Sequence, residues 1–383
     1  MKKFMEKVSI LSLSLVLTTS FSISSAQSAM FAFYKDLPES WVELLVSLPS
    51  AGIMLMLVLN GLVEKYLSER KMIVTGLLIF ALCGFVPLVN KAYWVIFASR
   101  LIFGMGVGLL NAKAISIISE RYEGKERIQT FGLRGSAEVV GTALLTLGVS
   151  QLLHFGWEIS FLVYASGLIV LALYLLFVPY GKEEKHHEAR QEGKGLTAAQ
   201  WFLTIGLALV AAVIVLTNVV INVRVPGLVE KSGMGSVQTA GLILSTMQLI
   251  GIAAGLSFAP LLHYFKENLL TVAGVAFGLT SIMIGLAPNL LLLSVVTIAS
   301  GFVYSVSLTS IFHILSERIP SKSLNQATSI VILGCSAGAT ATTFFLSLIS
   351  QFSSQASFIF GVLGSLMVLM AVLAFGILKK KSA

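Results

Sequence analysis

Residues 93–121 read YWVIFASRLIFGMGVGLLNAKAISIISER. Before the Ser-Glu-Arg end of this stretch, only Arg100 and Lys113 carry a charge at neutral pH. A helix that crosses a bilayer needs about 20 predominantly apolar residues. The stretch therefore predicts one membrane-spanning helix, because its apolar residues run on without the alternation that is typical of a half-buried strand.

The rest of the chain has the same character. Of 383 residues, 56% are hydrophobic and 11% are charged, and the mean hydropathy is +0.91. A soluble domain carries roughly 25% charged residues, so the composition excludes an ordinary soluble enzyme. The continuous apolar runs exclude a membrane β-barrel. We expect an all-α membrane protein with 12 transmembrane helices, at residues 8–27, 42–63, 72–90, 93–118, 130–153, 159–179, 199–222, 237–262, 269–287, 290–316, 326–350 and 357–378.

One long charged segment, GKEEKHHEARQEGK from Gly181 on, interrupts the apolar runs. Such a segment is typical of a solvated linker, and its two adjacent histidines are expected to be solvated as well. We therefore expect a six-helix bundle over residues 1–180, a cytoplasmic linker over 181–197 and a second six-helix bundle over 198–383.

The N-terminus allows two interpretations. Lys2 and Lys3, the apolar run after them and the Ser-Ala-Gln-Ser-Ala segment that ends at Ala29 resemble a cleavable signal peptide. The apolar run continues through residues 30–33, which makes it long enough to span a bilayer. We favour a first helix that is retained.

The distribution of basic residues predicts the orientation. The chain has 26 Lys and Arg and a net charge of +8. Most of these residues fall in the segments that lie on the same side of the membrane as the N-terminus. The positive-inside rule then places both termini in the cytoplasm. Because the basic residues are distributed over loops between spans, they predict no nucleic-acid partner.

The two halves repeat when the sequence is shifted by 197 residues. Four matches coincide in the predicted topology: Ser119-Glu120-Arg121 with Ser316-Glu317-Arg318, Gln129 with Gln326, Gly104 with Gly301, and Gly141 with Gly338. Parallel six-helix halves, related by an axis along the membrane normal, are a known transporter architecture with the substrate site between the halves.

The central stretch carries a family resemblance. Arg100-Leu-Ile-Phe-Gly104-Met-Gly106-Val-Gly108 matches the fourth-helix pattern Arg-x-x-x-Gly-x-Gly-x-Gly of the major facilitator superfamily. The resemblance covers nearly the whole chain through topology, linker position and repeat. It implies two pseudo-symmetric six-helix bundles that move a small molecule by alternating access. The three glycines are expected to allow close helix packing.

A loop and the fifth helix bear on mechanism and direction. The segment Gly61-Leu-Val-Glu64-Lys65-Tyr-Leu-Ser-Glu-Arg70-Lys71 is similar to the family's cytoplasmic loop Gly-x-x-x-Asp-Arg-x-Gly-Arg-Arg, although the acid stands one place early and Lys65 takes the Asp position. The resemblance implies a conformational role for Gly61, Glu64, Lys65, Arg70 and Lys71. Many drug–proton antiporters of the family carry Gly-Pro in the fifth helix, and this chain lacks the proline.

Charged residues within the spans give the sharpest chemical signal. An ionisable side chain at the bilayer centre costs about 2.5–3.5 kcal/mol on insertion scales, so it usually has a partner or a task. Lys113 and Glu138 are equally far from the turn of one predicted hairpin, and Arg134 is four residues before Glu138. We expect a Lys113–Glu138–Arg134 cluster. It is either a proton-coupling site or a structural ion pair that holds the fourth and fifth helices together. The acidic residues Asp36, Glu39 and Glu43 are expected to be solvated.

Further polar residues in the spans are candidates for a substrate cavity, although interhelical hydrogen bonding or, for the arginine, snorkelling to the interface would explain them too. They are Arg100, Asn111, Asn218, Asn222, Gln248 and Tyr304.

These features favour a secondary active transporter in the bacterial cytoplasmic membrane, multi-pass and monomeric. Proton-coupled efflux of drug-like or amphipathic compounds is the leading hypothesis, and proton-coupled uptake of a neutral or anionic nutrient is the alternative. A non-transporting membrane sensor or enzyme is a remote third. The expected partners are the small-molecule substrate, protons and the lipid bilayer. The sequence holds no phosphate-binding loop of the Gly-x-x-x-x-Gly-Lys-Ser/Thr type, so no nucleotide cofactor is predicted, and neither is a metal.

Overall fold

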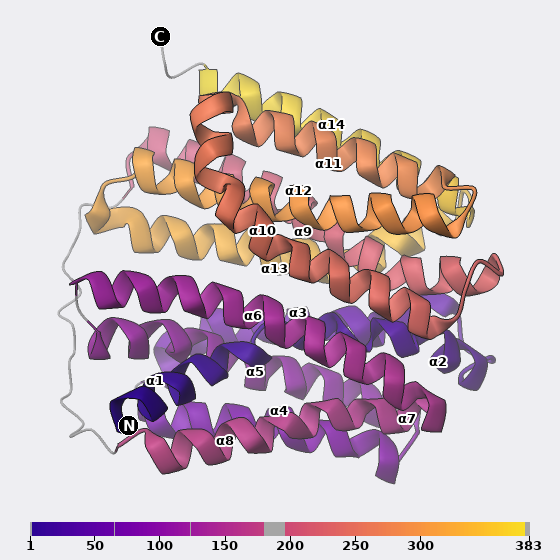
Figure 1. Cartoon of the computed structure of the whole chain (residues 1–383), viewed down its shortest axis with the longest axis horizontal. Helices are drawn as coiled ribbons and strands as arrows, with labels where there is room; N and C mark the ends of the chain where they lie inside the picture. The colour runs from indigo at the N-terminus through magenta and orange to yellow at the C-terminus, as the bar shows by residue number, and fades with distance from the viewer. Residues whose placement is uncertain (1, 65, 123, 180–195, 380–383) are drawn as a thin grey trace. The chain divides into compact units, whose positions relative to one another are not determined.

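The computed structural model describes residues 2–64, 66–122, 124–179 and 196–379, and over these ranges the chain forms helices and no strand (Figure 1). The prediction of an all-helical protein is confirmed. Most of the expected linker lies outside the described residues.

The first half contains α1 (Lys2–Ser12), the 3-10 segments η1 (Leu13–Val16) and η2 (Thr19–Ala26), α2 (Gln27–Phe33), α3 (Glu39–Val63), α4 (Glu69–Val89), α5 (Tyr93–Arg121), α6 (Gly124–Leu152), η3 (Leu153–Phe155), α7 (Trp157–Ser160), η4 (Phe161–Ala165) and α8 (Ser166–Phe177). The second half contains α9 (Ala198–Lys231), α10 (Val237–Phe265), η5 (Lys266–Asn268), α11 (Leu269–Leu286), α12 (Leu290–Arg318), α13 (Ser321–Ser350) and α14 (Ala356–Lys379).

By length and composition, ten helical stretches in the described ranges could cross a membrane, or eleven if a bent pair at the N-terminus counts as one span. One of the ten, Val237–Leu286, is 50 residues long and contains both α10 and α11. The structure therefore supports a multi-pass protein, and the number of twelve spans stays a prediction.

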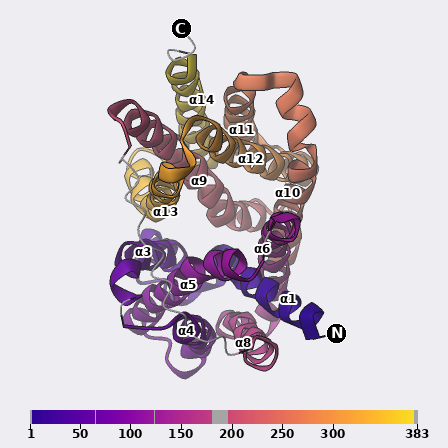
Figure 2. The same cartoon turned by 90° about the vertical axis from the view of Figure 1, so that its left-hand side faces the viewer.

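The chain divides into two compact units. The first comprises Met1–Glu184 and Val229–Ser245, and the second comprises Lys185–Leu228 and Thr246–Ala383. In the first unit α5 packs against α3 and α4, while α6 packs against η1 and η2. In the second unit α11 packs against α12 and α14. Figure 2 shows many of these helices nearly end-on, so that each unit is seen as a bundle of helices.

Close packing at glycines follows the 197-residue repeat. A Cβ atom on Gly141 would collide with the main chain of Leu15, and one on Gly338 would collide with the main chain of Ala212, which is the residue 197 places after Leu15. Gly104 lies in the same way against Pro49, and its counterpart Gly301 lies against Met247. The sequence matches thus coincide with matching helix contacts inside each unit.

The first membrane segment is broken. Two helical pieces, Lys3–Val16 and Thr19–Phe33, meet at a bend of 49°, and the backbone between Leu13 and Ala26 is mostly 3-10 helix. Short 3-10 stretches inside a helix mark strain or a functional hinge. The break lies beside α6, where the hydroxyls of Thr18 and Thr142 are 2.6 Å apart.

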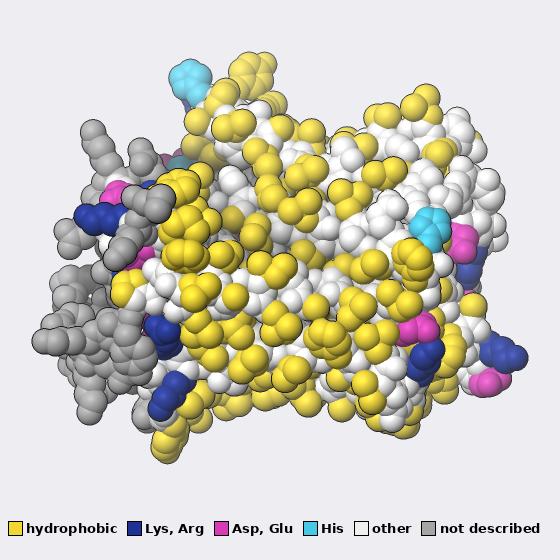
Figure 3. Space-filling model, turned by 60° about the horizontal axis from the view of Figure 1, so that its bottom comes forward, with side chains coloured by type: hydrophobic (Ala, Val, Ile, Leu, Met, Phe, Trp, Pro, Cys, Tyr) yellow, Lys and Arg dark blue, Asp and Glu magenta, His cyan; other side chains and the backbone are white. Residues whose placement is uncertain are grey.

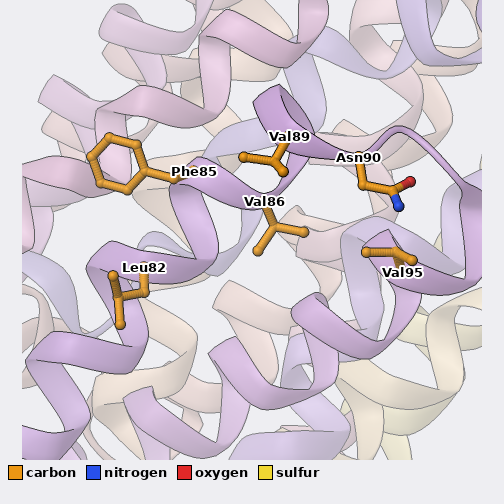
Figure 4. A pocket seen from close by; sticks show the side chains of 6 residues that line it. All are labelled: Leu82, Phe85, Val86, Val89, Asn90 and Val95. Carbon is orange, nitrogen blue, oxygen red and sulfur yellow. The ribbon is translucent and has the colours of Figure 1, made fainter.

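The surface matches a membrane environment. On the face in Figure 3, hydrophobic side chains cover the middle, and most of the charged side chains lie towards the two ends. A shallow hollow of about 320 Å³ lies on α4 and the start of α5 (Figure 4). Because its lining is mostly apolar and Val89 in it is 87% exposed, we assign the hollow to the lipid-facing surface. The lining residues are Leu82, Phe85, Val86, Val89, Asn90 and Val95.

Candidate functional site

Arg134 and Glu138 form an ion pair on α6. The Nη2 atom of Arg134 lies 2.6 Å from Oε1 of Glu138, and both residues are half-buried within the candidate span Leu133–Phe155. The two residues are four apart on one helix, so they share a face. The hydroxyl of Thr142 donates to the main-chain oxygen of Glu138 and also meets Thr18 of the broken first segment. The pair therefore lies next to the helix break.

Lys113 does not complete the expected three-residue cluster. Its Nζ atom donates to Oε1 of Glu64 at 2.9 Å, and the pair that Glu138 forms within the described residues is with Arg134. The expected cluster rested only on the equal number of residues that separate Lys113 and Glu138 from the turn between their two helices. Since α5 packs mainly against α3 and α4, Lys113 meets the end of α3 instead of α6. The predicted cluster is two separate pairs.

The Lys113–Glu64 pair lies where α3 ends. The amide of Asn60 donates to the same carboxylate at 2.8 Å. Burial acts to raise the pKa of Glu64, but the hydrogen bonds from Lys113 and Asn60 and the Lys113 charge outweigh it, so the pKa lies below its ordinary value. At neutral pH the carboxylate is ionised and holds Lys113.

Other residues of the predicted conformational loop contact the end of α8. Arg70 donates from Nη1 to the main-chain oxygen of Val178 at 3.1 Å, and its guanidinium lies 5.8 Å from the ring centre of Tyr174. Arg121 donates to the next oxygen, that of Pro179. Lys71 is exposed, Gly61 belongs to α3, and Lys65 lies outside the described residues. Arg70 and Arg121 thus hold the chain directly after the end of α8.

Arg100 is almost fully buried, with 2% of its surface exposed. Its Nε atom donates to the main-chain oxygen of Leu45 at 2.9 Å, and its Nη2 atom donates to that of Ser20 at 2.8 Å. Its guanidinium also lies over three aromatic rings, with the centre of the Phe103 ring 4.8 Å away. These contacts tie α5 to α3 and to η2 inside the first unit.

Glu43 is a residue whose position the sequence did not predict. The expectation that it is solvated is wrong, because 2% of its surface is exposed. It lies in the first turns of α3, within the candidate span Glu39–Asn60. Its proximity to the loop residue Asp36 suggested solvent. The sequence feature that indicated burial is the run Glu43-Leu-Leu-Val-Ser47, in which three apolar residues follow Glu43 directly. Ser47 at its end is also buried.

The remaining cavity candidates lie in or near other helices. The Asn222 side chain donates to the main-chain oxygen of Asn218 at 2.8 Å, which uses one amide within α9 itself. Asn111 and Gln248 are half-buried in α5 and α10. The ring centre of Tyr304 lies 6.0 Å from that of Phe277. A role for these residues in substrate binding stays a prediction.

Over the described ranges, no group of three or more His, Cys, Asp or Glu side chains could hold a metal ion. Cys83 and Cys335 are both free thiols.

Comparison with known proteins gives the family. A family model described as Major Facilitator Superfamily matches residues 4–290. Among curated proteins, a "Protein TsgA homolog" of Yersinia pestis (strain Pestoides F) is 23% identical over 322 residues, which is 82% of this chain and 79% of that protein. A homologue with the same description in Yersinia pseudotuberculosis (serotype O:1b, strain IP 31758) matches equally well.

Solved structures share the fold. A D-xylose–proton symporter has a TM-score of 0.76 at 18% identity and covers 98% of both chains. The nucleoside transporter NupG has a TM-score of 0.75 at 16% identity, over 98% of this chain and 100% of that one. A peptide transporter POT has a TM-score of 0.78 at 14% identity, over 98% and 94%.

Proposed function

The chain belongs to the major facilitator superfamily, and from this premise we propose that it is a secondary active transporter whose Arg134–Glu138 pair couples the movement of a small molecule to protons. Membership makes it a multi-pass transporter of a bacterial membrane and not an enzyme. The coupling ion, the direction and the residues are the proposal. We propose further that it acts as a monomer, with both termini in the cytoplasm.

The geometry of the Arg134–Glu138 pair carries the proposal. Both side chains belong to α6, so the pair itself does not hold α5 to α6, which is the structural role that the sequence suggested. A carboxylate within a span is costly unless it is paired or has a task. A proton on Glu138 removes the charge that holds Arg134, which gives the pair two states. Contacts of the neighbouring Thr142 with Thr18 would pass that change to the first segment.

On direction, we favour uptake over the efflux that the overall sequence pattern suggested. The carboxylate of Glu64 balances the charge of Lys113. Arg100 is held by main-chain oxygens and aromatic rings. The three acids Glu43, Glu64 and Glu138 balance the three cations in the predicted spans of the first unit, so these groups carry no net charge and suit a neutral substrate better than a cationic drug. Two solved structures that share this fold are described as a D-xylose–proton symporter and a nucleoside transporter, and these descriptions support a neutral solute and proton coupling.

The experiment uses the full chain in liposomes with a pH-sensitive dye inside and an imposed proton gradient. The probes are D-xylose, uridine, a dipeptide and a lipophilic cation such as ethidium. We expect a neutral probe to move with protons. Glu138→Gln should abolish proton flux evoked by that probe but keep probe exchange across the membrane.

The matched control is Glu126→Gln, which removes an acid from the same helix at an exposed position outside the span. It should keep proton coupling. Unchanged coupling in Glu138→Gln would refute the role of the pair. Proton flux opposite to the flux of ethidium would establish efflux in place of uptake.

A further inference from the structure

The break in the first segment leaves buried polar groups without partners. Within the described part of the chain, the hydroxyls of Ser20, Ser24 and Ser25 make no hydrogen bond, and neither does the amide oxygen or the amide nitrogen of Gln27. Gln27 is 2% exposed, and the three serines are 0–3% exposed. Buried polar groups in proteins are nearly always hydrogen-bonded, so a group of unpaired ones calls for an explanation.

Other hydroxyls in the same segment do have partners. Thr19 donates to the main-chain oxygen of Val16, and Ser22 to that of Thr142 on α6. A general deficit of acceptors around the segment therefore does not explain the unpaired groups. In a 3-10 helix, residues three apart lie one above the other, which places Gln27 directly after Ser24 in one row.

The backbone at the break is held from outside. Arg100 donates to the main-chain oxygen of Ser20, and the Tyr164 hydroxyl donates to that of Thr19. These bonds take up oxygens that a regular helix would use internally. In transporters, broken helices whose irregular backbone is buried in protein form substrate and ion sites near the midplane. The break has this construction.

The chemistry of the free groups indicates what they bind. The Ser24 hydroxyl and the Gln27 amide offer both donors and acceptors, and neither carries a charge. A sodium ion would use the oxygens alone and would leave the amide nitrogen of Gln27 without an acceptor. An anion would find hydroxyl and amide donors here, but Arg100 already donates to main-chain oxygens.

From these observations we infer that Ser24 and Gln27, which lie in one row at the break of the first segment, bind a neutral, hydroxyl-rich solute such as a monosaccharide or nucleoside. The inference rests on the proposed function and names its substrate class. These groups are shielded from solvent in this structure. A substrate site must be closed to solvent in at least one state of an alternating-access cycle, so the burial agrees with the inference. A hydroxyl-rich solute would supply each free donor with an acceptor and each free acceptor with a donor.

The test is equilibrium counterflow in liposomes, which measures solute exchange without a proton gradient. The probes are radiolabelled neutral monosaccharides and nucleosides, with ethidium as the cationic probe. Wild-type protein should exchange at least one neutral probe. Gln27→Leu and Ser24→Ala should each raise its half-saturation concentration by about tenfold, the equivalent of roughly one hydrogen bond. Gln27→Asn should retain part of the affinity, which separates loss of the amide from misfolding.

Ser28→Ala is the matched control, since Ser28 neighbours Gln27 but is only half-buried, and it should behave as wild type. Unchanged neutral exchange in Gln27→Leu, exchange of ethidium alone, or exchange that requires sodium would overturn the inference while the chain remains a transporter. If no probe of any class moves in wild-type protein, the proposed function fails together with the inference.

Discussion

The guanidinium of Arg100 donates a hydrogen bond to the main-chain oxygen of Ser20, 2.8 Å away, and so joins α5 to the broken first segment. A second bond reaches Leu45 on α3. A buried arginine that bonds two main-chain oxygens at once acts through the fork geometry of its donors, which a lysine lacks. Arg100 thus holds three elements of the first unit together.

We expect Arg100→Lys to lower the free energy of unfolding by about 1.5–3 kcal/mol, because at least one main-chain oxygen loses a charged donor. The measurement is thermal unfolding of the purified protein in detergent. If Arg100 instead binds substrate, as the sequence suggested, Arg100→Lys should bind substrate more weakly and keep the wild-type melting temperature.

Gly104 is a second place where a small change should be costly. A Cβ atom there would collide with the main chain of Pro49, which cannot move away as the end of a flexible side chain does. Gly104→Ala should therefore reduce the yield of folded protein and its melting temperature. Gly135→Ala is the control, because no atom of the described residues lies within 4 Å of its added Cβ atom. It should be neutral or slightly stabilising, since alanine is the better helix former. Equal losses in the two variants would show that contact with α3 is not the cause.

The Glu64–Lys113 pair should make stability depend on pH. Because the folded state lowers the pKa of Glu64 below its ordinary value of 4.5, the pair stabilises the protein above that value, and the contribution disappears as the pH falls through the folded pKa. The melting temperature of wild-type protein should exceed that of Glu64→Gln at pH 7. The difference should shrink below about pH 4.5. A difference that stays constant from pH 7 to pH 4 would contradict this account.

The fold was predictable from the sequence because membrane helices leave a strong pattern. Long apolar runs separated by charged loops can be recognised without tertiary information, because every segment that spans the lipid must be apolar and helical. The 197-residue repeat was also visible, and it coincides with the contacts of Gly141 and Gly338. The broken first segment was not visible. Its serines and Gln27 read as part of one apolar run, and a 3-10 backbone has no distinct period over so short a length.

The candidate site was predictable only in part, for a geometric reason. Arg134 and Glu138 lie four apart on one helix, so their contact follows from helix geometry alone. Lys113 lies on a different helix, and its partner depends on the rotation of α5 about its own axis, which the sequence does not specify. Glu43 was misassigned because the distance of a residue from a loop does not show which way its side chain points.

The orientation in the membrane is open to a direct test. With both termini in the cytoplasm, the loop at Tyr66 lies inside, and the loops at Asn90 and Phe352 lie outside. All three residues are exposed, so cysteines there would be accessible. In a background with Cys83 and Cys335 replaced by alanine, a membrane-impermeant maleimide added to intact cells should label Asn90→Cys and Phe352→Cys. Tyr66→Cys should react only after the cells are opened. Labelling of Tyr66→Cys in intact cells would reverse the proposed orientation, and the direction of transport relative to the proton gradient would then have to be assigned anew.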